Sequence, residues 1–431
     1  MSQPSNFSRR HWLATLGKAS AAGAVLMMAP SYARAAGGKV VVIGGGFGGA
    51  TAAKYIKRRN PAIDVTLVEP AKTYYTCPFT NLYFGGLRTF EQQGHGYDEL
   101  RAMGVKVVHD YASDINTRGK TVSLAGGDTL AYDKLLLSPG IDFRWNALEG
   151  YDEAAAERAP HAWKAGDQSV LLKKQLESMR DGGTFVMVAP ANPFRCPPGP
   201  YERVSMVAHY LKQNKPKSKI LVLDSKDAFS KQGLFQAGWD RFYGDLIEWV
   251  PMSKDGKVVR VDAANLSVES EFGEIHKADV LNVIPPQKAG VIAEKAGVTN
   301  ESGWVPVKHQ TFESERVADV YVVGDATVAA PMPKSGFSAN AQAKVAAAAI
   351  VNALAAKPNA EPAFANTCYS LIAPDYGISV AHTYLLKEGK LAEASGGVSP
   401  ADADDGFRKL EAEYGESWYK AIALDTWGTQ A

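Results

Sequence analysis

The sequence of 431 residues has three cysteines, and each stands where a sulfur atom could do redox chemistry. Cys77 lies in Tyr-Tyr-Thr-Cys-Pro, shortly after a glycine-rich turn, and Cys196 lies in Arg-Cys-Pro-Pro-Gly-Pro, directly after an apolar run. Cys368 follows much later, in Asn-Thr-Cys-Tyr. A thiolate is a nucleophile, and two thiols can be oxidised reversibly to a disulfide. A free cysteine can also be a small buried apolar residue, and this alternative stays open for each of them.

The spacing of the cysteines and histidines does not suit a metal site. The chain has no paired cysteines and no His-x-x-x-His, which are the usual ligand spacings. It also has no Cys-x-x-Cys-His, the attachment motif of a c-type haem. We therefore expect neither a protein-bound metal ion nor a haem in this chain.

The glycine-rich turn belongs to a pattern of strand, turn, helix and strand. An apolar strand over residues 39–43 runs into a turn at residues 44–49, and helix-forming residues follow over 50–57. A second strand over residues 65–68 ends in Glu69. This order, with an acid about twenty residues after the glycines, is the fingerprint of a dinucleotide-binding unit.

Each glycine of the turn has a physical role in such a unit. Gly44, Gly46 and Gly49 allow the tight turn, the close approach of the backbone to a pyrophosphate, and the packing of helix on strand, and Gly48 lies between them. The N-terminus of the helix offers free N–H groups and a partial positive charge to the phosphates. Glu69 would accept hydrogen bonds from the ribose hydroxyls.

Two later segments favour FAD over NAD. Residues 132–140, which end in Gly140, resemble the strand and turn that return the chain to the FAD domain in flavoproteins with two dinucleotide-binding domains. Residues 320–325 end in Gly324 and Asp325, and they resemble the late strand whose aspartate reaches the ribityl and phosphate region of FAD. With the glycine turn in the same order, these segments predict bound FAD.

A second strand–helix–strand unit lacks the glycine turn. A strand over residues 184–188 is followed by a helix over 201–211 and a strand over 220–224. The segment between the first strand and the helix, residues 189–200, contains prolines and Cys196 instead of glycines at the phosphate positions. Proline removes N–H donors, and β-carbons block the close approach of a phosphate. We predict a domain with the nicotinamide-binding fold that does not bind NADH.

The first residues resemble an export signal. Ser-Arg-Arg-His-Trp-Leu at residues 8–13 is close to a twin-arginine motif, an apolar run follows to Met28, and Ala33-Arg34-Ala35 supplies the small residues of a cleavage site. A membrane anchor is the alternative, but the run is short and diluted by glycines and Lys18. We predict a twin-arginine signal peptide over residues 1–35 and therefore a protein located in the periplasm. Disulfides persist in that compartment.

Length and composition bound the remaining possibilities. The chain is 46% hydrophobic and 22% charged, with a net charge of +1, so nothing favours a nucleic-acid partner. No long apolar segment follows the signal, and we expect no integral membrane segment. The chain is too long to fold around one ordinary hydrophobic core, so its length predicts several domains.

At this point the sequence resembles one family, the flavoprotein subunit of flavocytochrome c sulfide dehydrogenase, which is related to sulfide:quinone oxidoreductases and to glutathione-reductase-type enzymes. The resemblance covers essentially the whole mature chain, and the cysteine-bearing segments are its most specific part. The segments that carry it are residues 48–57, 74–77, 160–166, 193–202, 331–336, 366–369 and 417–419. Pro78 and Phe79, directly after Cys77, depart from the pattern.

The resemblance implies an α/β fold with two Rossmann-like domains of the glutathione-reductase type and a C-terminal α+β interface domain. The predicted boundaries are 36–149 and 291–360 for the two parts of the FAD-binding domain, 150–290 for the NADH-domain-like part without a nucleotide loop, and 361–431 for the interface domain.

The resemblance also implies roles for single residues. Cys77 would hold FAD through an 8α-S-cysteinyl thioether, and Cys196 and Cys368 would form a redox-active disulfide beside the flavin. Glu202 would serve this disulfide as a proton carrier, although an acid at a helix start can also be a surface residue. Trp418 would lie near the flavin ring, or else form a dimer or partner contact.

Residues 332–336 should start a helix whose N-terminus faces the flavin. There Lys334 and the helix dipole would stabilise the anionic reduced flavin.

The implied activity is oxidation of hydrosulfide to sulfur or polysulfide, with electrons passed to a separate c-type cytochrome subunit. Two alternatives stay open. A sulfide:quinone oxidoreductase would need an apolar or amphipathic C-terminal element, and residues 401–431 contain a charged, helix-like segment with aromatic residues instead. A non-catalytic flavin electron carrier would not need the cysteines at all.

Overall fold

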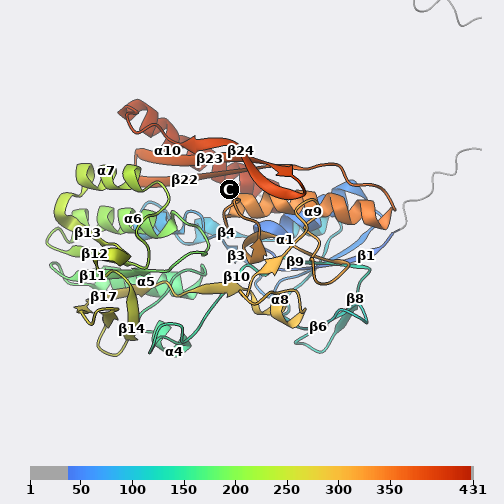
Figure 1. Cartoon of the computed structure of the whole chain (residues 1–431), viewed down its shortest axis with the longest axis horizontal. Coiled ribbons are helices and arrows are strands. Elements are labelled where there is room, and N and C mark those ends of the chain that lie inside the picture. The colour runs from blue at the N-terminus through green and yellow to red at the C-terminus, as the bar shows by residue number, and fades with distance from the viewer. Residues whose placement is uncertain (1–36, 429–431) are drawn as a thin grey trace, which may run out of the picture. The chain divides into compact units, whose positions relative to one another are not determined.

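The computed structural model describes residues 37–428, and its first sheet carries the glycine-rich turn (Figure 1). The predicted signal segment, residues 1–35, lies outside the described residues. All strands of this sheet are parallel, and their order across the sheet is β20, β9, β1, β2 and β5. Their bounds are β1 (Lys39–Ile43), β2 (Asp64–Val68), β5 (Lys106–Val108), β9 (Lys134–Leu137) and β20 (Val320–Val322). Nearly every residue of β1 and β2 is buried, as expected of a parallel sheet covered on both faces.

Two long helices pack against each other over this sheet. Helix α1 (Phe47–Arg59) begins in the glycine turn, and α9 (Gly336–Leu354) contacts it along its length. Many alanines on both helices are buried, which lets the helix axes come close. The Oγ atom of Ser335 accepts a hydrogen bond from the N–H of Ser338 at 3.0 Å and so caps α9. The predicted helix start near residues 332–336 is therefore confirmed.

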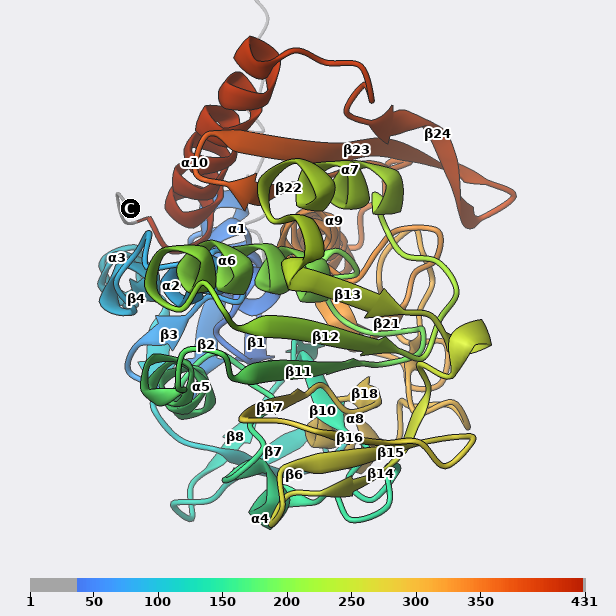
Figure 2. The ribbon, with the colours of Figure 1, turned by 90° about the vertical axis from the view of Figure 1, so that its left-hand side faces the viewer.

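A second parallel sheet has the strand order β13, β12, β11 and β17 (Figure 2). Its strands are β11 (Thr184–Ala189), β12 (Lys219–Asp224), β13 (Ile247–Val250) and β17 (Val280–Val283). Helix α6 (Gly199–Asn214) connects β11 to β12 and starts two residues before the predicted helix. The proline-rich loop that contains Cys196 lies between β11 and α6, where a nicotinamide-binding domain has its phosphate turn.

A third, antiparallel sheet covers part of the first two. It consists of β22 (Ala363–Ala373), β23 (Tyr376–Lys387) and β24 (Lys390–Val398), and the long helix α10 (Asp405–Trp427) packs on it. The last turn of α10 reaches α1, because Lys54 Nζ donates a hydrogen bond to the carbonyl of Leu424 at 2.9 Å. Strand β22 packs on both α6 and α9, so it joins the two halves of the molecule.

These three sheets confirm the predicted α/β architecture. The domain boundaries stay predictions; the first sheet takes its strands from residues 39–137 and 320–322, and the second from residues 184–283. The smaller elements are β3 (Tyr74–Tyr75), α2 (Thr80–Phe84), η1 (Glu91–Gln93), β4 (Gly94–His95), α3 (Asp98–Ala102), β6 (Ala112–Asn116), β7 (Thr121–Leu124), β8 (Thr129–Ala131), β10 (Ile141–Phe143), α4 (Glu153–Ala156), α5 (Asp167–Ser178), α7 (Gln232–Phe242), η2 (Gly244–Leu246), η3 (Met252–Lys254), β14 (Val258–Asp262), β15 (Ser267–Ser270), β16 (Ile275–Lys277), β18 (Gln287–Ala289), α8 (Val291–Lys295), β19 (Val305–Pro306), η4 (Gly324–Ala326) and β21 (Thr327–Val328).

Two composition-based expectations concern membranes and metals. Within residues 37–428, no helix combines the length and apolar character that crossing a bilayer requires. The same residues contain no cluster of three or more His, Cys, Asp or Glu side chains that could hold a metal ion.

The buried His161 makes folding stability depend on pH. Its Nδ1 accepts a hydrogen bond from the N–H of Trp163 at 3.0 Å, which requires the neutral ring. Burial, together with the nearby cations Lys164, Arg203 and Arg195, lowers the pKa of His161 from 6.5 to about 3. Below about pH 6.5 His161 is therefore protonated in the unfolded chain but stays neutral in the folded chain. As a result, the free energy of unfolding falls as the pH drops.

We expect His161→Gln to lose less stability than the parent protein on acidification. Between pH 6.5 and 5 the single histidine contributes about 2 kcal/mol of the loss, at about 1.4 kcal/mol per pH unit. Urea unfolding at pH 7.5 and pH 5, followed by far-UV circular dichroism, measures both proteins. Equal losses in the two proteins would show that His161 is not the buried neutral group described here.

Candidate active site

The glycine turn has the geometry that a pyrophosphate requires. Gly44 has φ +98°, and a β-carbon on Gly49 would lie 1.7 Å from the carbonyl oxygen of Gly44. A β-carbon on Gly48 would lie 2.4 Å from Ser138 Oγ. Gly46 precedes α1 with no side-chain cap, so the first N–H groups of the helix stay available to an anion.

Glu69 connects the end of β2 to this turn. Its Oε2 accepts a hydrogen bond from the N–H of Gly45 at 2.7 Å, and its Oε1 accepts one from the N–H of Ala71 at 2.9 Å. The carboxylate therefore lies beside the glycine turn, as predicted for a ribose-binding acid. Gly140 follows β9 with φ +63°, and its carbonyl accepts a hydrogen bond from Gly290 N–H at 3.0 Å.

Two unpaired buried polar atoms, one directly after Gly324 and one on helix α10, fit a bound flavin dinucleotide. Asp325 Oδ1 and Trp418 Nε1 are buried and have no hydrogen-bond partner among the described residues. Gly324, with φ +80°, precedes Asp325 and donates its N–H to Gln342 Oε1 at 2.7 Å. Burial raises the pKa of Asp325, and Arg195 and Lys334 oppose that rise. Unpaired buried groups are costly, and the ribityl and ring atoms of FAD would offer them partners.

A small cavity of about 50 Å³ brings together most of the predicted redox residues. The three cysteines, Glu202 and Trp418 all line it. They come from four separate regions of the chain: the loop after β3, the loop between β11 and α6 with the first turn of that helix, strand β22, and helix α10. The remaining lining residues are Pro78, Phe79, Arg195, Pro198, Ser335, Gly336, Tyr369 and Ser370.

Cys196 is held in a conformation that few side chains adopt. Its φ is +58°, in the left-handed region, where a non-glycine residue is strained. Its N–H donates to the carbonyl of Lys334 at 2.8 Å, and its own carbonyl accepts from Gly199 N–H at 2.8 Å. A β-carbon on Gly199 would lie 2.8 Å from Cys196 Sγ. The backbone therefore fixes where this sulfur lies.

All three cysteines are free thiols in the structure. The predicted disulfide between Cys196 and Cys368 is thus not formed here and stays a prediction. Interaction with the neighbouring Cys196 thiol lowers the pKa of Cys77 to about 6 against the opposing effect of burial. Arg195 and Arg203 add to the lowering. The same interaction and burial raise the pKa of Cys196, so Cys77 is the thiol that ionises first.

Cys368 lies on the buried face of β22. Asn366 Nδ2 approaches Cys368 Sγ at 3.8 Å, and Asn366 Oδ1 accepts a hydrogen bond from Ser335 Oγ at 2.6 Å. Burial raises the pKa of Cys368, while the charge of Lys231 is the largest opposing influence. Asn366, which is bonded to Ser335 at the N-terminus of α9, therefore lies beside this thiol, and the charge of Lys231 acts on it.

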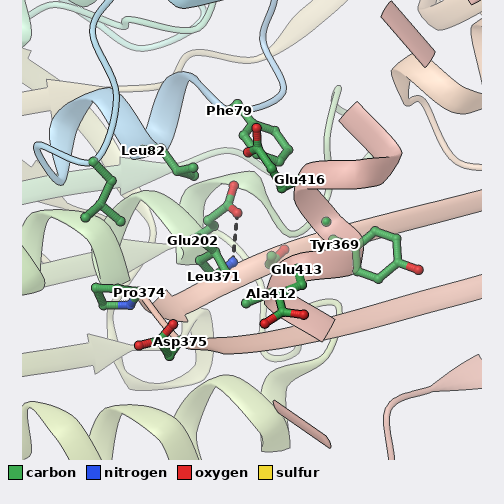
Figure 3. A pocket seen from close by; sticks show the side chains of 13 residues that line it. Phe79, Leu82, Glu202, Tyr369, Leu371, Pro374, Asp375, Ala412, Glu413 and Glu416 are labelled. Atoms are coloured by element: carbon green, nitrogen blue, oxygen red, sulfur yellow. Dashed lines mark hydrogen bonds between the residues drawn. The ribbon is translucent and has the colours of Figure 1, made fainter. Parts of the chain in front are cut away.

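Glu202 lines both the cysteine cavity and a larger outer cavity of about 300 Å³, and Figure 3 shows it among the side chains of the larger one. Its Oε1 accepts a hydrogen bond from Leu371 N–H at 3.0 Å, and its Oε2 accepts one from Asn81 Nδ2 at 2.8 Å. Burial raises the pKa of Glu202 above its ordinary value. A carboxyl group held in this way, with a raised pKa and lining both cavities, can accept and release a proton.

Two predicted flavin contacts differ in their placement. Trp418 lines the cysteine cavity and stacks with Phe79 at 6.4 Å and with Phe337 at 6.4 Å between ring centroids. Lys334 does not line it: its Nζ donates to the carbonyls of Asp325 and Thr327, both at 2.7 Å. It also lies 3.8 Å from the centre of the Trp304 ring. Burial lowers the pKa of Lys334 to about 8.

Three cations near the cysteines were not expected from the sequence: Arg203 and Lys231, which are buried, and Arg195, which lines the cysteine cavity. Arg203 donates hydrogen bonds to Asn282 Oδ1 at 3.0 Å and to the carbonyl of Ala162 at 2.6 Å. Arg195 and Arg203 adjoin Cys196 and Glu202 in sequence, so proximity could have suggested them. Nothing in the sequence around Lys231 points to the cysteines, since α7 reaches them only through the tertiary fold.

Two parallel sheets, a glycine turn with FAD-type surroundings and a cysteine-lined cavity define a flavoprotein oxidoreductase with two Rossmann-like domains. Residues 38–177 match the pyridine nucleotide-disulphide oxidoreductase family. Residues 169–285 match the central part of the sulfide dehydrogenase (flavocytochrome c) flavoprotein chain, and residues 360–427 match the flavin-binding part of flavocytochrome c sulphide dehydrogenase. The chain belongs to this family of sulfide-oxidising flavoproteins.

Individual relatives agree with this assignment. The sulfide dehydrogenase flavoprotein chain of Chlorobaculum thiosulfatiphilum is 60% identical over 35 residues, which are 8% of this chain and 73% of that sequence. The mitochondrial sulfide:quinone oxidoreductase of Mus musculus is 22% identical over 302 residues, 65% of this chain and 63% of the mouse protein. The chain thus spans less than two thirds of that relative's length.

Solved structures show the same fold. The sulfide:quinone oxidoreductase of Aquifex aeolicus superposes with a TM-score of 0.72 at 18% identity, covering 91% of this chain and 93% of that one. A putidaredoxin reductase–putidaredoxin complex superposes with a TM-score of 0.61 at 16% identity, covering 92% of this chain and 100% of that one.

Proposed function

We propose that the protein is a sulfide dehydrogenase of the flavocytochrome c type. It oxidises hydrosulfide to polysulfide or sulfur at Cys196 and Cys368, uses FAD as the oxidant of these cysteines, and passes the electrons to a separate c-type cytochrome. The observation that carries the proposal is the cavity that gathers Cys196, Cys368, Glu202 and the Cys77 thiol in one place. The matches to the flavocytochrome c family support the same activity.

The sulfur chemistry begins with the oxidised form of the cysteine pair. A hydrosulfide ion attacks one sulfur of the disulfide, so that one cysteine becomes a persulfide and the other leaves as a thiolate. A second hydrosulfide attacks the outer sulfur of the persulfide, which frees the second thiolate and releases HSSH. HSSH then loses a proton to give HSS⁻. In total, two hydrosulfide ions become one hydrodisulfide ion, one proton and two electrons.

Bound at the glycine turn, FAD would supply the two-electron oxidation that turns the two thiolates back into a disulfide. Glu202, with its raised pKa, takes the proton that HSSH releases and passes it toward the outer cavity. The free N–H groups of α1, Glu69 and Asp325 would hold the dinucleotide. Cys77 would hold the flavin through a thioether, and a thiol whose pKa is lowered to about 6 suits the formation of such a bond.

Quinone is the second candidate acceptor. Several relatives are named sulfide:quinone oxidoreductases, and α10 exposes Phe407, Leu410 and Tyr414 at helical spacing. However, charged residues such as Lys409 and Glu413 alternate with them, which is a poor surface for lipid. A periplasmic c-type cytochrome also agrees with the proposed twin-arginine export of residues 1–35.

A single spectroscopic experiment tests the proposal. The purified mature holoprotein is mixed with sodium sulfide in a stopped-flow instrument, and the flavin absorbance near 450 nm, a general flavin band, is followed. Sulfide should bleach it, and oxidised cytochrome c should restore it much faster than decylubiquinone does. Faster recovery with the quinone would establish the second candidate. A flavin that sulfide does not bleach would leave only the non-catalytic electron carrier.

A further inference from the structure

Lys231 is a buried ammonium group beside the cysteine cavity that no step above uses. It precedes α7 with φ +62°, in the left-handed region, and only 7% of the residue is exposed. Its Nζ donates a hydrogen bond to Ser370 Oγ at 2.9 Å and a longer one to the carbonyl of Ile378 at 3.4 Å. A strained backbone and a buried charge are both costly, so a compensating role is expected.

This ammonium has no carboxylate partner. Within residues 37–428, no ion pair of 4.0 Å or less involves Lys231. Lys226, another buried lysine five residues earlier, is instead paired with a carboxylate, because its Nζ lies 2.5 Å from Asp224 Oδ1. A buried cation without a carboxylate in contact is stabilised by hydrogen-bond acceptors and by negative charge that lies farther away.

The strand geometry brings a cysteine sulfur to the same face of β22 as the serine that Lys231 contacts, and Glu202 and Glu411 are the carboxylates that also act on this lysine. Cys368 and Ser370 are two residues apart on β22, and alternate residues of a strand share one face. Ser370 lines the cysteine cavity and the outer cavity, and its hydroxyl accepts the hydrogen bond from Lys231. The ammonium therefore lies behind the wall of the cavity, next to the position that Cys368 occupies.

We infer that Lys231 supplies the positive charge that stabilises anionic sulfur in this cavity, first the incoming hydrosulfide ion and then the thiolate of Cys368. The inference rests on the proposed function for the identity of the substrate. The charge on Lys231 and its position beside Cys368 do not depend on that function.

The titratable groups around the two residues allow this role. Lys231 is the largest charge-based influence that lowers the pKa of Cys368 against burial, while Glu202 raises it. Burial lowers the pKa of Lys231 to about 8, so the ammonium stays charged at neutral pH and loses its proton under alkaline conditions. The other groups that face this pair are Cys196, Tyr384 and Glu411.

The test is the pH dependence of Cys368 alkylation in the full holoprotein. The reduced protein is treated with iodoacetamide between pH 6 and 10, and modification of the Cys368 peptide is quantified by mass spectrometry. We expect Lys231→Gln to raise the apparent pKa of Cys368 by about one unit, which means about tenfold slower alkylation at neutral pH. Lys231→Arg retains the charge and should restore the parent profile.

Two control variants separate charge from structure. Ser370→Ala removes the hydrogen bond but leaves the ammonium, and it should shift the profile much less than Lys231→Gln. Lys215→Met removes a different buried ammonium, which donates to the carbonyls of Leu176 and Glu177, and it should leave Cys368 unchanged. An unaltered Cys368 profile in folded Lys231→Gln, or an equal shift in Lys231→Arg, would overturn the inference. Because alkylation needs no turnover, this result is independent of whether sulfide bleaches the flavin.

Discussion

Replacing Cys196 with serine is expected to abolish sulfide-dependent reduction of the flavin, by roughly three orders of magnitude or more. A hydroxyl group is nearly the size of a thiol but cannot form a disulfide or a persulfide, so the first step of the proposed chemistry has no electrophile. Two backbone hydrogen bonds hold Cys196: its N–H donates to the carbonyl of Lys334, and its carbonyl accepts from the N–H of Gly199. Serine at this position can form both bonds. The fold and the bound flavin should therefore survive.

Stopped-flow mixing with sulfide measures this loss, and dithionite provides the control. Dithionite should reduce the flavin of Cys196→Ser as fast as that of the parent protein, because it does not need the cysteines. Cys368→Ser should show the same loss as Cys196→Ser, since neither thiol alone can form the disulfide. If one of the two serine variants is bleached by sulfide at nearly the parent rate, that cysteine is not part of the redox pair.

Replacing Cys77 with serine is expected to release the flavin from the polypeptide on acid denaturation, whereas the parent protein should retain it. Interaction with the Cys196 thiol lowers the pKa of Cys77 to about 6, which favours the thiolate of Cys77 at neutral pH. A serine hydroxyl stays protonated and is a far weaker nucleophile, so no covalent bond to the flavin would form. The glycine turn is unchanged, and FAD should still bind without the link.

Intact-mass measurement and visible absorption after acid precipitation test this directly. The parent protein should carry the added mass of FAD, and Cys77→Ser should have the mass of the polypeptide alone, with yellow colour in the supernatant. Cys368→Ser is the matched control, because it removes a cavity thiol other than the one that lowers the pKa of Cys77, and it should retain the flavin on the chain. Parent protein that loses its flavin on denaturation would contradict the covalent link.

Local sequence patterns determined the fold class and most of the cofactor site. A run of four apolar residues, six turn residues rich in glycine and a helix-forming stretch can only pack in a few ways, so β1, the turn and α1 follow from neighbouring residues alone. The same holds for the start of α9, where Ser335 caps the helix that the sequence predicted. The proline-rich loop before α6 likewise showed that the second domain lacks a phosphate turn.

Contacts between distant residues were decided only by the tertiary structure. The sequence left open whether Glu202 is a surface acid, and the packing of β22 on α6 places it between two cavities. The sequence also gave no sign that Cys196 would interact with Cys77. Nor did it indicate that the Lys334 side chain would contact backbone carbonyls and Trp304.

Lys231 is the clearest example of a residue whose environment is decided by the tertiary structure and not by the neighbouring sequence. Nothing in its neighbourhood distinguishes it from a surface lysine at a helix start, and its burial depends on β22, which lies more than a hundred residues later. The sequence thus determined which chemical groups are present, because periodicity and turn chemistry are local. The environment of each group depends on long-range packing, and that packing sets which thiol ionises and which charge faces it.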